Sequence, residues 1–243
     1  MKAWWTQTRA EVRMTIQRGE TLLLTLGIPI GLLVFFSLVK VTTLPAGRRV
    51  DFLAPGILAL CVLSTSLVAL SIATGFERSY GVLRRLHVTP LGRPRLIAAK
   101  MTGVLVTEAI QVVVLAAVAL VLGWHPHGGA ATLASTVLAL VLGSAGCAGI
   151  GLLLAGRLRA EVNLAASNGL YLILLLFSGI VVPLSSLPSA LRAVVLWFPS
   201  AAMADVVHTV LGSGETPSLR DWVALTGWAL LAPLLAARTF RFD

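Results

Sequence analysis

Side chains that could do chemistry are few in this sequence and stand far apart. His125 and His127 flank a proline, while Asp205 and His208 lie three residues apart in another region. A metal site needs three or four converging ligands, and no acidic residue or cysteine stands near the first pair. We interpret the first pair as part of a turn and the second as a polar pair, and we expect neither a metal site nor catalytic residues.

Motifs of ATPases and hydrolases are absent from the chain. A phosphate-binding loop needs the pattern Gly-x-x-x-x-Gly-Lys-Ser/Thr, but none of the lysines, Lys2, Lys40 and Lys100, follows a glycine. The sequence also lacks Gly-x-Ser-x-Gly and His-Glu-x-x-His. Cys61 and Cys147 both lie inside apolar runs, which gives no disulfide framework. We therefore expect a protein that is not an enzyme.

One acidic residue, Glu108, lies well inside an apolar run, with Gln111 three residues further on. A charge at the middle of a membrane costs about 2.5–3.5 kcal/mol on insertion scales, and residues three apart share a helix face. Two interpretations stay open. The pair lines a path for a substrate, or Glu108 is a structural hydrogen-bonding residue between helices.

Composition identifies the chain as a polytopic membrane protein. Hydrophobic residues make up 57% of the 243 residues and charged residues 12%, with a mean hydropathy of +0.92. The net charge of +9 could indicate nucleic-acid binding in a soluble protein. In a membrane protein, cations instead collect on cytoplasmic loops, so we expect no nucleic-acid partner.

The apolar runs predict an all-α fold with six transmembrane helices, since about 20 residues cross a bilayer. Residues 1–20 predict an amphipathic interfacial helix with Trp4 and Trp5 at headgroup level, rather than a disordered tail or a cleavable signal peptide. Residues 183–220, with Pro183, Pro188 and Pro199, predict an external re-entrant hairpin of two short helices. The expected spans are 21–41, 52–74, 96–122, 131–155, 164–182 and 221–237.

The alternative joins the two short helices of residues 183–220 into a seventh span. The distribution of cations favours six spans with both termini cytoplasmic, because a seventh would move Arg238 and Arg241 to the outside. In the six-span arrangement the outer cations are Lys40, Arg48, Arg49, Arg192 and Arg220, and the other 14 of the 19 lie inside.

The stretch between the second and third spans is unusually basic. Val82, Leu83 and Leu86 share one face of a short predicted helix, which Thr89 and Pro90 end. An ordinary cytoplasmic loop with an interfacial helix would show the same features. Within residues 75–100 lie six cations: Arg78, Arg84, Arg85, Arg93, Arg95 and Lys100.

The residue order in this stretch resembles the cytoplasmic loop of type-2 ATP-binding-cassette (ABC) permeases. That family has Glu-Arg-Glu-x-Gly-Thr-Leu-x-x-Leu, then Thr-Pro-Leu, then a lysine; here Ser79 and Val82 depart from the pattern. A second resemblance lies in "SGIVVPLSSLPSALRAVVLWFPSAA", which is similar to the family's external helical hairpin. The matching loop residues are Glu77, Arg78, Gly81, Leu83, Leu86, Thr89, Pro90, Leu91 and Lys100.

The resemblance implies one permease domain over residues 1–243, whose loop 75–95 is a coupling helix seated in a groove of a separate ATPase. It implies two ATPase subunits, which bind ATP and magnesium, and a second permease subunit, identical or paralogous, facing the first and fifth spans. Leu83 and Leu86 would enter the groove, with Glu77, Arg84 and Arg85 at its rim. The implied coupling residues are Glu77, Arg78, Tyr80, Gly81, Leu83, Arg84, Arg85, Leu86, Thr89 and Pro90.

The leading hypothesis is therefore the permease of a bacterial cell-membrane exporter for an amphiphilic drug, antibiotic or lipid. A polysaccharide or glycoconjugate exporter is the alternative; it is less favoured because only two tyrosines, Tyr80 and Tyr171, are available for stacking on sugars. A lipid enzyme lacks the clustered acids or histidines that it would need, and a non-transporting anchor or sensor remains a further alternative.

Overall fold

The computed structural model describes residues 19–39, 49–87, 92–180 and 187–241, and every element in these ranges is a helix. The all-helical prediction is thus confirmed for the described part of the chain. The predicted interfacial helix lies almost wholly outside it, as do Pro183, Thr89 and Pro90. The helices are α2 (Gly19–Leu38), α3 (Arg49–Leu63), η1 (Ser64–Ala69), α4 (Leu70–Ser79), α5 (Val82–His87), α6 (Gly92–Val121), α7 (Ala130–Ala155), α8 (Ala160–Leu176), α9 (Ser189–Val195), α10 (Pro199–His208), η3 (Thr209–Ser213) and α11 (Leu219–Thr239).

Four of these helical segments are long and apolar enough to cross a membrane: Arg49–Ser79, Pro94–Val121, Ala130–Ala155 and Leu219–Thr239. The first is α3, η1 and α4 in continuous succession, with η1 a π-helix. Ser189–Val195 and Pro199–Ser213 meet at an angle of 89° and count as a fifth span only if joined. Thr25–Leu38 and Ala160–Leu176 are shorter apolar helices. A multi-span helical membrane protein is confirmed, while the number six stays a prediction.

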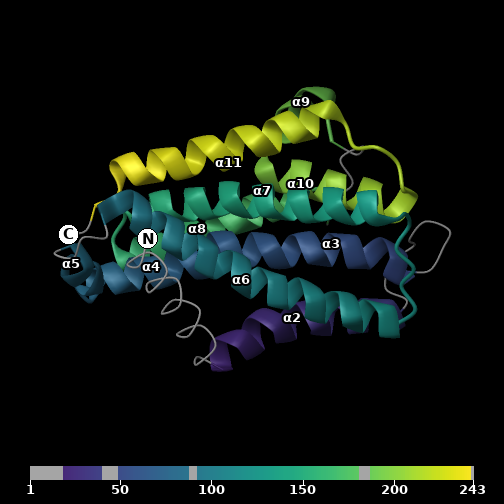
Figure 1. Ribbon diagram of the computed structural model, residues 1–243, viewed down its shortest axis with the longest axis horizontal. Coiled ribbons are helices and arrows are strands. Elements are labelled where there is room, and N and C mark those ends of the chain that lie inside the picture. Colours follow the sequence, from purple (N-terminus) through teal and green to yellow (C-terminus); the bar gives the residue numbers. More distant parts are fainter. Residues whose placement is uncertain (1–18, 40–48, 88–91, 181–186, 242–243) are drawn as a thin grey trace.

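The long helices lie side by side along the length of the molecule (Figure 1). Helix α7 runs through the middle and contacts α11, α10, α4 and η1, whereas α2 lies at one edge against α3 and α6. Helix α5 lies at one end of the bundle and α9 near the other (Figure 1).

Glycines in α7 allow the neighbouring helices to approach it closely. A Cβ atom built on Gly149 would lie 2.5 Å from the Pro233 nitrogen in α11, and one on Gly151 would lie 2.7 Å from the Leu67 carbonyl oxygen in η1. Neither neighbour is a flexible side-chain end, so only glycine fits at either position. Close backbone approach of this kind replaces the hydrophobic driving force that helices lack in lipid.

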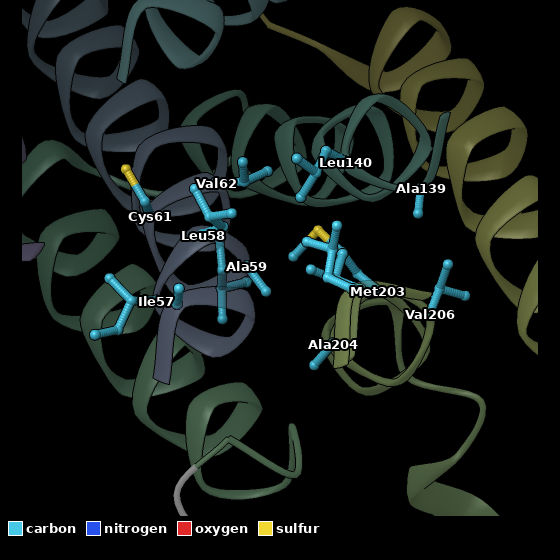
Figure 2. Packing of buried hydrophobic residues seen from close by; sticks show 14 of the residues in the cluster. Ile57, Leu58, Ala59, Cys61, Val62, Ala139, Leu140, Met203, Ala204 and Val206 are labelled. Atoms are coloured by element: carbon cyan, nitrogen blue, oxygen red, sulfur yellow. The ribbon is translucent and has the colours of Figure 1, made fainter. Parts of the chain in front are cut away.

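The central core also holds α10, which the sequence placed in an external hairpin. Met203 and Val206 of α10 are fully buried and pack beside Leu58 of α3 and Leu140 of α7 (Figure 2). This half of the hairpin inserts among α3, α7 and α11, as a re-entrant element does. Helix α9 remains largely exposed.

Candidate functional site

Glycine forms the tight turn between α4 and α5. The backbone of Gly81 has φ +72°, in the left-handed region that side chains disfavour, and α4 ends at Ser79 while α5 begins at Val82. The glycine of the basic motif thus has a local role: it reverses the chain so that α5 folds back onto the end of the bundle.

An ion pair connects this element to the next long helix. The Lys100 Nζ in α6 lies 2.6 Å from the Glu77 Oε2 in α4, and the two side chains are 1% and 19% exposed. The pair is partly buried and joins α4 to α6. Glu77 and Lys100 therefore contact each other, although the sequence prediction placed Glu77 at the rim of an ATPase groove.

Arg78 is also engaged within the chain. Its Nη1 donates to the Ala155 carbonyl at 2.8 Å, and its Nη2 donates to the Leu158 carbonyl at 2.6 Å. The last carbonyls of a helix have no partner within that helix, so the guanidinium caps α7. Two cations and one acid of the basic motif thus attach α4 to α6 and α7.

Leu83 of α5 points inward and is fully buried against its own bundle. Its side chain is therefore covered within this chain, and its entry into a groove of an ATPase stays a prediction. Its cluster contains Leu70, Leu96, Ile97, Ala148, Leu152, Ala236 and Phe240. The side chain of Leu86 lies outside the described part.

Other side chains of the turn and α5 remain at the surface. Tyr80 is 74% exposed and stacks on Phe76 with ring centroids 6.0 Å apart, and Val82 is 42% exposed. Arg84 and Arg85 are exposed as well. We call Tyr80, Val82, Arg84 and Arg85 the α5 tip. It combines two apolar side chains with two cations, a composition suited to contact with another protein.

Cations gather at the end of the bundle that carries the α5 tip, which we call the basic end. The backbone nitrogen of Arg241 donates to the Gly156 carbonyl, which joins the end of α11 to the α7–α8 turn there (Figure 1). The acids of this end in the described part are Glu77 and Glu161. Its described cations are Arg78, Arg84, Arg85, Arg95, Lys100, Arg157, Arg159, Arg238 and Arg241.

The opposite end carries several acidic and histidine side chains. Arg220 contacts Asp221 at 2.7 Å and Asp205 at 3.4 Å. The His208 ring lies 5.3 Å from that of Phe52, in a cavity of about 200 Å³ that Asp205 also lines. No group of three or more potential metal ligands occurs within the described ranges.

Two prolines and two further histidines also lie at this end in the described part of the chain. Pro188 precedes α9 and Pro199 is the first residue of α10, positions that suit proline because no helical N–H is lost. His125 and His127 are exposed, and the His125 backbone nitrogen donates to the Asp51 Oδ1 at 2.8 Å. Both histidines lie in the turn between α6 and α7.

In the middle of the bundle, Glu108 and Gln111 have different surroundings. The Gln111 Oε1 accepts hydrogen bonds from Thr65 Oγ1 at 3.0 Å and from Cys61 Sγ at 3.5 Å, so this residue connects α6 to α3 and η1. Glu108 interacts with the Ser144 hydroxyl of α7 and lines a groove that Gln111 does not line. The sequence had left open that the two residues line one path together. In the structure they do not line the same groove.

A second polar cluster in the bundle was not singled out from the sequence. The Ser71 Oγ lies 2.9 Å from the Asn163 Oδ1, and the Ser167 hydroxyl donates to the Ser71 Oγ at 2.8 Å. Asn163 Nδ2 also donates to the Ser71 carbonyl at 2.9 Å. Polar residues inside apolar helices are the signal that could have revealed this contact between α4 and α8, since such side chains hydrogen-bond between helices in membranes.

Comparison with known proteins agrees with this architecture. The family model for "ABC-2 type transporter" matches residues 2–211. A Bacillus subtilis (strain 168) protein, "Putative transport permease YvfS", is 23% identical over 239 residues, which cover 95% of this chain and 94% of that protein. The chain thus belongs to the ABC-2 type transporter family and is the non-catalytic membrane permease subunit of such a transporter.

Proposed function

We propose that this permease exports amphiphilic molecules such as drugs, antibiotics or lipids across a bacterial cell membrane, driven by two separate ATPase subunits. The observation that carries the proposal is the α5 tip: two apolar side chains and two cations exposed on an element that is rigidly attached to the bundle. ATP and magnesium are then bound by the partner ATPases. A second permease subunit completes the transporter.

The contacts beneath the α5 tip supply a route for mechanical coupling. Glu77 binds Lys100 of α6, Arg78 caps α7, and Leu83 packs against residues of α6, α7 and α11. A displacement of α5 by an ATPase is therefore passed to three long helices at once. Packed elements transmit such shifts because they change between discrete arrangements and do not deform continuously.

A groove between α9 and α11 favours an amphiphile over a polysaccharide. It has a volume of about 680 Å³ and contains Trp197 and Trp228, which could stack on sugars. Its other lining residues are apolar, however. A sugar site needs hydrogen-bonding groups for the hydroxyls as well as aromatic faces, so polysaccharide or glycoconjugate export remains the second candidate.

Transport by the reconstituted complex tests the proposal. The permease is combined in vesicles with its partner ABC ATPase, and we expect a cationic amphiphilic dye to stimulate ATP hydrolysis and to accumulate in inside-out vesicles. An ATPase with its phosphate-binding lysine replaced serves as the control. Stimulation by an oligosaccharide-lipid but not by the dye would favour the second candidate.

We further propose six spans with both termini in the cytoplasm, α2 and α8 being the two shorter ones and the basic end facing inward. In intact cells, Ser79→Cys should be protected from an impermeant maleimide and His127→Cys should react. His127 is a better site than Gly128, whose positive φ of 96° disfavours a side chain. Native Cys61 and Cys147 are buried and give little background. Reaction at Ser79→Cys with protection at His127→Cys would reverse the orientation.

A further inference from the structure

A narrow groove opens on the side of the bundle between α3, α6 and α7. It has a volume of about 200 Å³, and its lining is apolar apart from Glu108. Val113, Val137 and Val141 line it and are 68%, 50% and 40% exposed. Because these valines lie well inside α6 and α7, the groove opens toward the surroundings of the spans and not toward either end.

A buried hydrogen-bond acceptor lies in this groove. Glu108 is 4% exposed, and its Oε1 contacts no hydrogen-bond donor within the described part of the chain. The carboxyl interacts with the Ser144 hydroxyl and lines the groove. An unsatisfied carboxyl oxygen in an apolar environment is unfavourable, and such groups in membrane spans normally face a partner.

We infer that the groove binds the head of an amphiphile that carries a primary ammonium group and enters sideways from the bilayer. The ammonium donates to the Glu108 Oε1, and the first methylenes lie against Val137, Leu140 and Val141. The volume equals that of roughly six or seven water molecules in the liquid, which accommodates an ammonium and a short part of the chain. The remainder of the chain extends between the exposed valines into the lipid.

The ammonium is favoured over an ordinary acyl chain for an electrostatic reason. An acyl chain would fill the groove but leave the carboxyl oxygen without a donor. A charge-assisted hydrogen bond in a medium of low dielectric constant is stronger than a neutral one. The inference rests on the proposed function only for the step that follows binding, namely export of the bound amphiphile.

Photolabelling of the full-length permease in lipid nanodiscs tests the site without any ATPase. The probe is dodecylamine with a diazirine in its chain, and the comparison probe is the corresponding dodecanol. We expect the amine to label Val113, Val137 and Val141 at about tenfold lower concentration than the alcohol. Leu133 of α7 is 64% exposed and does not line the groove, so it reports background labelling by lipid-soluble probes.

Two matched variants separate the carboxyl from general charge effects. Glu108→Gln retains the volume but replaces the ionisable carboxyl with an amide, and we expect it to abolish the tenfold preference for the amine. Glu161→Gln removes an exposed carboxyl from α8 and should retain that preference. Equal labelling of the wild type by both probes would overturn the inference, since an ordinary chain would then occupy the groove. So would valine labelling no stronger than that of Leu133, or an amine preference that persists in Glu108→Gln.

The outcome is independent of the transport test. Amine binding at the groove without stimulation of ATP hydrolysis would support the binding site but contradict its role in export. Dye transport with no amine preference at the groove would support the proposed function but contradict this binding site. If Glu108→Gln fails to fold, the comparison of amine and alcohol on the wild type still decides.

Discussion

A permease with Val82→Asp is expected to fold normally but to bind its ATPase about thirtyfold more weakly. Val82 is 42% exposed at the α5 tip, so an aspartate there remains hydrated and costs the permease little stability. In the proposed complex the same carboxylate would be forced into an apolar contact. Loss of an anchoring residue at an interface typically costs about 2 kcal/mol of binding free energy. This cost corresponds to an increase of about thirtyfold in the dissociation constant. Co-purification and ATPase titration measure the effect.

The neighbouring residue supplies the matched control. Leu83 is fully buried in the permease, so Leu83→Ala should lower the free energy of unfolding by about 2–5 kcal/mol. Its effect on ATPase affinity, measured on the folded fraction, should be smaller than that of Val82→Asp. The reverse result would be weaker ATPase binding by Leu83→Ala and unchanged binding by Val82→Asp. It would contradict the assignment of the α5 tip and indicate that α5 rotates on binding, so that Leu83 faces the ATPase.

The second large effect concerns the ion pair between α4 and α6. Glu77→Ala removes the carboxylate that lies 2.6 Å from the Lys100 ammonium, whose side chain is only 1% exposed. Removing one member of a buried ion pair typically costs about 3–5 kcal/mol, and we expect a decrease of that size in the stability of the permease. Thermal unfolding in detergent measures it.

A double-mutant cycle then isolates the interaction. Lys100→Met replaces the ammonium with an unbranched apolar chain, and Glu77→Ala combined with Lys100→Met should be more stable than Glu77→Ala alone. Glu161→Ala, which removes an exposed acid at the same end, should change stability by no more than about 0.5 kcal/mol. Additive effects of the two single changes would mean that the pair contributes no coupling between α4 and α6.

The helical class and the order of the helices could be predicted from the sequence. Long apolar runs have one stable outcome in lipid, because only intrahelical hydrogen bonds satisfy their backbone groups. The runs at residues 52–74, 96–122, 131–155 and 221–237 correspond to helices long enough to span. The residue order around Glu77 and Gly81 likewise identified the family, which the family match over residues 2–211 confirms.

The tertiary structure alone decided which side chains face a neighbour. Periodicity placed Val82 and Leu83 on one helix face but could not say that Leu83 turns inward while Val82 remains exposed. Glu77 and Lys100 are 23 residues apart, and their contact depends on how α4 meets α6.

The same holds in the interior, where Glu108 faces a lateral groove and α10 enters the core. The physical reason is that lipid and protein are both apolar in a membrane, so the lipid-facing and buried surfaces of a helix have similar compositions. Hydropathy therefore locates the helices along the chain, and only their packing determines which residues are left to bind a partner or a substrate.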